Sequence, residues 1–153
     1  MQIGLMRKLL FFFALPVFII ACTPPLPKMT PQPGELSNHI VPPGTLLVVY
    51  KPDGTRSAFN YDEFNTLEKD SITIGSKVYQ GPRLFTVLDA ARIENYKAVT
   101  LIGEKTEIRL VKRQIHEGMI IDIDQRNHLQ FLAESIPVES WVDKINVIEV
   151  EAE

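Results

Sequence analysis

The sequence of 153 residues has little of the material from which many enzyme sites are built. It contains one cysteine, one tryptophan and three histidines. It has no glycine-rich phosphate loop and no Gly-x-Ser-x-Gly element. Beyond residue 22, no apolar run approaches the roughly 20 residues of a membrane-spanning helix, so this part of the chain is predicted to be water-soluble. These absences argue against thiol chemistry, phosphate-loop chemistry and a multi-span membrane protein.

The residues that are present are unevenly distributed. Four of the eight phenylalanines lie between Phe11 and Phe18, and seven of the eleven prolines lie between Pro24 and Pro43. The remaining chain, of about 110 residues, has an ordinary globular composition and is long enough for one packed core. The sequence therefore predicts an N-terminal segment at residues 1–21, a proline-rich segment at residues 22–43 and a single domain at residues 44–153.

Residues 1–21 have the layout of an export signal, with a basic start, an apolar stretch and a small residue at the end. The following Ile19-Ile20-Ala21-Cys22 resembles a bacterial lipobox. The resemblance implies cleavage before Cys22 and lipidation of its thiol with acyl chains such as palmitate. Two or more acyl chains give stable membrane anchoring. The open alternatives are an uncleaved anchor and a plain signal peptide with a free cysteine.

The lipobox resemblance also predicts location and charge. The uncharged Thr23 after the cysteine favours the outer membrane over the inner one, with the domain facing the periplasm. Removal of the export signal would leave 14 basic against 19 acidic residues, a net charge of −5. An acidic chain without a basic cluster gives no electrostatic footprint for nucleic acid.

The proline-rich residues 22–43 favour extended backbone over a packed element. At about 3.1 Å per residue, they would serve as a tether that holds the domain roughly 60 Å from the lipid. The alternative for Glu35 to Val41 is that this part lies along the domain.

The domain is predicted to be α+β, with mainly antiparallel or mixed β structure and two or three short helices. Asn60 and Glu63 have the spacing of a capping box and predict a helix over residues 61–67. Gly75-Ser76 predicts a type II′ hairpin, and Gly81-Pro82 is expected to end its second strand before a helix over residues 84–91. The remaining strands are predicted at residues 45–50, 57–60, 98–102, 106–111, 119–124, 128–133 and 145–150.

Few side chains in this domain suggest chemistry. His116-Glu117 lacks the second histidine of a zinc-protease helix, and the calcium-loop-like residues 122–127 lack the central glycine, so neither catalytic nor metal-ligating residues are predicted. Arg83, Arg109 and Arg113 are the candidates for binding an anionic cofactor. Trp141 is predicted to pack against the domain rather than stack on a substrate.

The order of elements from residue 70 to residue 150 resembles the molybdopterin-binding domain of the sulfite oxidase family. The resemblance rests on the Gly81-Pro82-Arg83-Leu84 segment with its apolar helix and on the closing segment from Trp141 to Val150. It implies a sulfite-oxidase-like fold, and it is the sole reason to consider molybdopterin as a cofactor. In that family a cysteine thiolate binds molybdenum, and this domain has none.

The missing thiolate favours a lipid-anchored envelope protein whose domain is a ligand- or partner-binding module, with no cofactor expected and no complete molybdenum site. Because fold alone does not establish function, two other classes stay open. One is a periplasmic molybdopterin-dependent oxidoreductase or its accessory, which needs a basic pocket. The other is a structural envelope lipoprotein.

Overall fold

The computed structural model describes residues 39–153; the expected export signal, Cys22 and the first part of the expected tether lie outside the described residues. Two α-helices and ten strands form the described part, which confirms the α+β prediction with mixed and antiparallel sheets. Their bounds are β1 Leu47–Tyr50, β2 Arg56–Phe59, α1 Tyr61–Asn65, β3 Lys69–Ile74, β4 Lys77–Pro82, α2 Leu84–Ala90, β5 Ala98–Ile102, β6 Glu107–Val111, β7 Met119–Ile123, β8 Leu129–Ala133, β9 Val142–Ile145 and β10 Val147–Glu151.

The main sheet has five strands in the order β2-β1-β10-β5-β6. Only β1 and β10 run parallel to each other, and the other three pairs are antiparallel. Strand β1 lies between two neighbours, and its successive residues Leu47, Val48 and Val49 are all buried, so the sheet is covered on both faces at this strand. None of the helices within residues 39–153 is long and apolar enough to cross a membrane.

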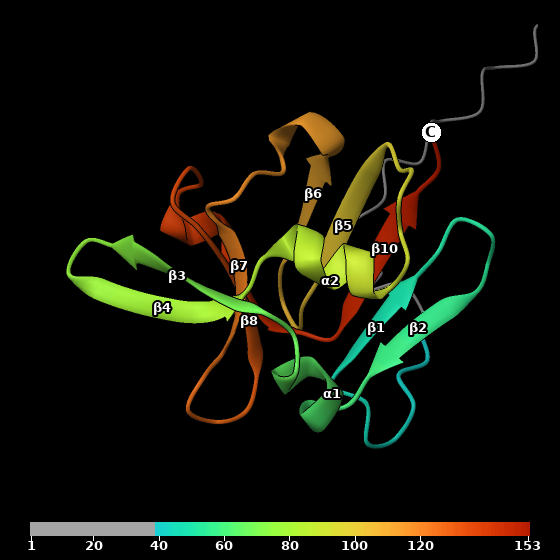
Figure 1. The fold of residues 1–153 in the computed structure, drawn as a ribbon, viewed down its shortest axis with the longest axis horizontal. Helices are drawn as coiled ribbons and strands as arrows, with labels where there is room; N and C mark the ends of the chain where they lie inside the picture. Colours follow the sequence, from blue (N-terminus) through green and yellow to red (C-terminus); the bar gives the residue numbers. More distant parts are fainter. Residues whose placement is uncertain (1–38) are drawn as a thin grey trace, which may run out of the picture. The chain divides into compact units, whose positions relative to one another are not determined.

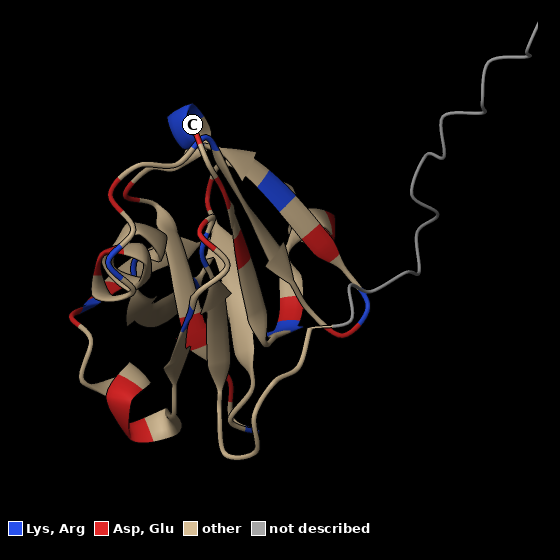
Figure 2. Ribbon diagram, turned by 90° about the vertical axis from the view of Figure 1, so that its right-hand side faces the viewer, with Lys and Arg blue, Asp and Glu red and all other residues tan. Residues whose placement is uncertain are grey.

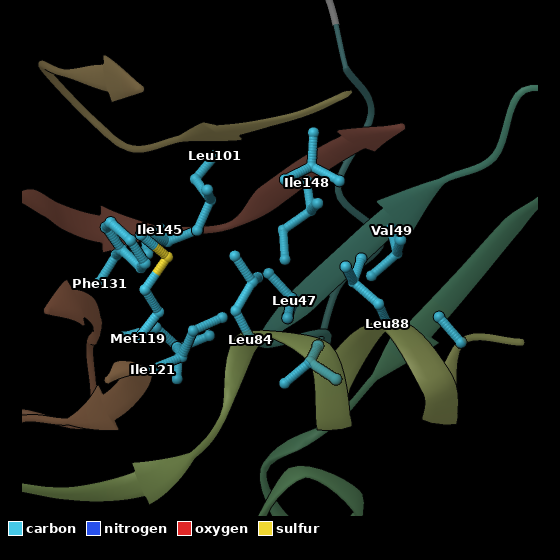
Figure 3. Close-up of a cluster of buried hydrophobic side chains, with 14 of the residues drawn as sticks. Leu47, Val49, Leu84, Leu88, Leu101, Met119, Ile121, Phe131, Ile145 and Ile148 are labelled. Atoms are coloured by element: carbon cyan, nitrogen blue, oxygen red, sulfur yellow. The ribbon is translucent and has the colours of Figure 1, made fainter. Parts of the chain in front are cut away.

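Helix α2 covers one face of this sheet (Figure 1). Its buried residues Leu84, Val87 and Leu88 have the i, i+3, i+4 spacing of one helical face. In Figure 3, Leu84 and Leu88 point toward Leu47 and Ile148 of the sheet. Burial of each such side chain contributes roughly 1.5–3 kcal/mol, so this face is what fixes the helix on the sheet.

Two smaller sheets complete the fold. Strands β7, β8 and β9 form one, and the β3-β4 hairpin extends away from the main sheet (Figure 1). An isolated hairpin is only marginally stable in water. Here the hairpin is supported by a small apolar cluster of Ile72, Ile120 and Leu132, packed with Tyr79 and Trp141.

The capping box of α1 is confirmed. Asn60 Oδ1 accepts the N–H of Glu63 at 2.9 Å, and Glu63 Oε2 accepts the N–H of Asn60 at 2.9 Å. At the hairpin tip, Gly75 has a φ of +63°, as the first central residue of a type II′ turn requires.

Gly81-Pro82 lies at the end of the hairpin strand and just before α2, as predicted, but both residues belong to the strand, which was predicted to stop at Gln80. Strand β4 runs through Pro82, paired with Lys69 of β3. Gly81 is required for another reason, because a Cβ at this position would overlap the backbone carbonyl of Ile121 in β7. The glycine permits the hairpin to approach the three-stranded sheet closely.

The strand predicted over residues 145–150 corresponds to β10, but its start was wrong, because residue 145 ends a separate strand, β9. The structure has β9, paired with β8, and then β10, paired with β1 and β5. The chain changes sheets at Asn146, whose N–H donates to the carbonyl of Ile102 at 3.2 Å. Buried apolar residues lie on both sides of this break, so the pattern reads as one continuous strand.

Candidate functional site

A cleft of about 490 Å³, called here the main cleft, lies at one end of the five-stranded sheet. Four segments meet there: the chain leading into β1, the β5-β6 turn, the β7-β8 turn and the bend between β9 and β10. The lining residues are His39, Val41, Thr45, Leu46, Ile102, Gly103, Glu104, Asn127, His128, Leu129, Lys144, Ile145, Asn146 and Val147. Its size and mixed lining are those of a small-molecule site.

The backbone around the main cleft is held in unusual conformations. Among residues 39–153, three non-glycine residues have positive φ, and two of them, Asn127 at +60° and Lys144 at +53°, line this cleft. Such conformations are unfavourable for most side chains and concentrate at functional sites. Gly103 adds a close approach, because a Cβ there would overlap the backbone carbonyl of Asp143.

A second cleft of about 360 Å³ adjoins the main one. Glu104 and Lys144 line both clefts and form an ion pair with each other, so the pair stands between the two hollows. The hydrogen bond and positive charge of Lys144 lower the pKa of Glu104. Both side chains are about half exposed, so water weakens the attraction between them.

The β7-β8 turn contains the calcium-loop-like residues. Asp124 Oδ1 accepts the backbone N–H groups of Arg126 and His128, each at 2.8 Å. These hydrogen bonds, the one from His128 first, lower the pKa of Asp124. The carboxylate therefore organises the polar turn that presents Asn127 and His128 to the cleft. No group of three potential metal ligands occurs in the described part of the chain.

The segment before β1 forms another wall of the main cleft. Nε2 of His39 lies 2.6 Å from Oε1 of Glu149, and the His39 ring packs on Tyr50 with centroids 4.3 Å apart. The Tyr50 hydroxyl donates to the carbonyl of Ile40 at 3.0 Å. Residues 39–41 thus follow the alternative in which the end of the proline-rich segment lies along the domain.

The three predicted arginines are not brought together by the structure. Arg83 pairs with Asp70 and lies 3.6 Å from Glu117, beside the hairpin. Its guanidinium and the Ser71 N–H, the latter first, lower the pKa of Asp70. Figure 2 shows basic and acidic segments interspersed over the visible strands and loops.

The other two arginines lie elsewhere. Arg109 on β6 makes two hydrogen bonds to the carboxylate of Glu151, at 2.6 and 2.7 Å. This pairing lowers the pKa of Glu151 and raises that of Arg109. Arg113 lines a separate hollow with Tyr96 and Lys112. None of the three lines the main cleft.

Trp141 packs on the domain, as predicted. Its ring meets Tyr79 edge-on with centroids 6.0 Å apart, and its Nε1 donates to the carbonyls of Ala133 and Ile136, each at 3.3 Å. Trp141 also lines the second cleft. The sequence pattern gave no reason to choose Gly103, Lys144 or Asn146, because the segments that carry them meet only in space. The polar turn at Asn127 was the one usable signal.

No protein-family model matches this chain, and no curated protein matches its sequence.

Proposed function

We propose that this protein is a lipid-anchored envelope lipoprotein whose sulfite-oxidase-like domain binds a ligand or partner, without a complete molybdenum site. The observation that carries the proposal is the main cleft. Four segments converge on it, and its polar groups come from turns held by positive φ values and a glycine contact. A rigid cleft of this kind is preorganised for binding.

The residues of the main cleft do not fit molybdopterin. A molybdenum centre uses a soft sulfur ligand, and the lining residues within 39–153 include no cysteine. The pterin phosphate requires cationic or helix-terminal groups; this described lining includes no arginine, and its lysine is paired with Glu104. We therefore assign the main cleft to binding of a ligand or partner rather than to molybdenum chemistry.

A structural envelope lipoprotein would expose a contiguous apolar patch and need no concave site. The large exposed hydrophobic residues within residues 39–153 are Ile40, Tyr61, Val78 and Val138, which come from different elements. Together with the cleft, this dispersal supports binding over a purely structural role.

Metal and pterin analysis of the purified full chain tests the binding proposal. Protein isolated from cells grown with molybdate should contain far less than one molybdenum atom and one pterin per chain. Stoichiometric molybdenum would contradict the proposal and favour the oxidoreductase alternative.

The anchor is tested separately. Cys22→Ser should leave the precursor uncut by lipoprotein signal peptidase and move any mature product to the soluble periplasmic fraction. Unchanged membrane fractionation of this variant would contradict attachment through Cys22.

A further inference from the structure

The main cleft and the second cleft share one boundary, the ion pair between Glu104 and Lys144. The two side chains are 53% and 46% exposed, and an exposed pair of this kind contributes little to stability. The pair can therefore separate at small cost when a ligand displaces it. The two hollows would then form one elongated groove, which reaches from Leu46 and Asn146 to Val138 and Trp141.

The main cleft offers side chains that are neutral or paired, whereas the second cleft is also lined by Lys105, Glu139 and Asp143, which form no ion pair within residues 39–153. Thr45, Asn127 and Asn146 line the main cleft, and none of them makes a side-chain hydrogen bond to another residue in the range 39–153. Each hydroxyl or amide can both donate and accept hydrogen bonds, which suits a ligand whose groups also do both. An anionic ligand is disfavoured, since the described lining of the two clefts holds three carboxylates, Glu104, Glu139 and Asp143, against two lysines, Lys105 and Lys144.

In the turns that line the main cleft, the backbone groups are already hydrogen-bonded and are not available for pairing with an added strand. The N–H of Gly103 donates to Thr106 at 2.9 Å, the N–H of Asn127 to Asp124 at 3.0 Å, and the N–H of Asn146 to Ile102. The carbonyl of Asn146 accepts from Val48 at 2.9 Å. An extended peptide gains affinity from such main-chain groups at a free sheet edge, and this groove lacks them at these positions.

The remaining surface is suited to the C–H faces of sugar rings. Val41 and Leu46, which are partly exposed, line the main cleft, and Val138 and Trp141 line the second. Apolar strips beside amides, hydroxyls and carboxylates match a ligand whose hydroxyl groups project from apolar rings.

We propose that the two clefts form one binding groove for an uncharged oligosaccharide, divided in the free protein by the ion pair between Glu104 and Lys144. This inference rests on the proposed function, because it names the ligand class of the same cleft. The main cleft holds the first sugar through its amides. Displacement of the ion pair admits the chain to the second cleft beside Trp141.

The experiment uses the full chain in detergent, titrated with the monosaccharide and the β-linked tetrasaccharide of N-acetylglucosamine. Calorimetry measures affinity, and emission from Trp141, the sole tryptophan, reports occupancy of the second cleft. The tetrasaccharide should bind more tightly than the monosaccharide and should alone shift the emission. Monosaccharide and tetrasaccharide binding with equal affinity, or no saccharide binding, would overturn the proposal.

Two substitutions probe the two ends. Asn127→Gly removes an amide while suiting the positive φ, and Glu139→Ala removes a carboxylate of the second cleft; each should weaken tetrasaccharide binding about tenfold. Asn65→Ala is the matched control, because the Asn65 amide bonds to Lys69 away from both clefts. An equal loss in the control would contradict the assignment.

An acetylated, amidated tetra-alanine serves as the peptide probe. Binding of this peptide as tightly as the tetrasaccharide would overturn the saccharide assignment in favour of a peptide groove. The molybdenum measurement distinguishes failure of the saccharide inference from failure of the proposed function. Absent molybdenum with no saccharide binding would overturn only this inference, whereas stoichiometric molybdenum would contradict the proposed function itself.

Discussion

Gly81 and Gly103 are two buried glycines that bring one strand against the backbone of another, and they do so in regions with different roles. Gly81 joins the β3-β4 hairpin to the three-stranded sheet, and a Cβ there would meet the carbonyl of Ile121. Gly103 directly follows β5, lies against Asp143 and also lines the main cleft. The close contact at Gly81 thus supports only folding, whereas the one at Gly103 supports folding and also shapes the binding surface.

The two contacts also differ in how readily they can relax. The three atoms nearest to the position of a Cβ at Gly81 all belong to the backbone of Ile121 and Asp122. At Gly103, one of the three is a side-chain atom, Cγ1 of Val142. A side chain can rotate away more easily than a strand can shift. An added methyl group should therefore destabilise the junction at Gly81 more than the one at Gly103.

The largest effect is therefore expected for Gly81→Ala. The added methyl group must displace β7, and overpacking of this kind should lower the free energy of unfolding by about 3 kcal/mol. Urea denaturation followed by far-UV circular dichroism measures the change.

The control for this substitution is Gly118→Ala. The nearest atoms to a Cβ at Gly118 belong to the side chain of His116, at 3.1 and 3.3 Å, so a small adjustment of that ring suffices. Equal destabilisation by both substitutions would show that the Ile121 contact is not what makes Gly81 necessary.

Gly103→Ala should have the next largest effect, lowering the free energy of unfolding by about 2 kcal/mol. Because Gly103 lines the main cleft, ligand binding should weaken in this variant even where the protein is fully folded. In contrast, Gly81→Ala should leave binding unchanged below its unfolding temperature. Calorimetric titration with the tetrasaccharide measures both variants, and intact binding by Gly103→Ala would remove the contrast between the two glycines.

These glycines also mark where sequence reasoning succeeds and where it fails. Local signals were sufficient for α1, whose capping box involves residues three positions apart, and for the apolar face of α2. Gly81-Pro82 carries an equally clear local signal and does mark the end of β4, but ending the strand is not what requires a glycine there. The actual reason for Gly81 lies in β7, some forty residues away in the sequence, which no local pattern reveals.

The site was still less accessible to prediction. The arginines were selected as cations that an anionic cofactor requires, but two of them are occupied by carboxylates. The residues that meet in the main cleft come from turns whose sequences resemble ordinary loops. Lys144 is the clearest case, because a lysine with positive φ has no signature in the sequence.

A smaller effect is expected where the segment before β1 closes the cleft. His39→Ala removes the ring contact with Tyr50 and the contact with Glu149, and should lower the free energy of unfolding by about 1 kcal/mol. The control is Ile40→Ala, since the Ile40 side chain is 74% exposed and its loss should change stability very little. Equal effects from the two substitutions would mean that residues 39–41 do not dock through His39.

The smallest effect concerns the boundary between the two clefts. The ion pair with Lys144 holds the pKa of Glu104 below its usual value of 4.5. A carboxyl group with a lowered pKa in the folded state stabilises the protein above its unfolded pKa. That contribution disappears as the pH falls through the lower, folded value, so the boundary should loosen only in acid, below about pH 4.5.

Carboxyl carbon shifts of Glu104, followed by NMR as the pH is lowered, measure this directly. The midpoint should lie below 4.5 in the unmodified chain and return toward 4.5 in Lys144→Met, because both the hydrogen bond and the positive charge are lost. Lys105→Met is the matched control, since Lys105 contributes charge alone and less of it, and its midpoint should move only slightly. A midpoint that responds equally to both substitutions would mean that the pairing with Lys144 is not specific. The two clefts would then have no defined boundary for a ligand to displace.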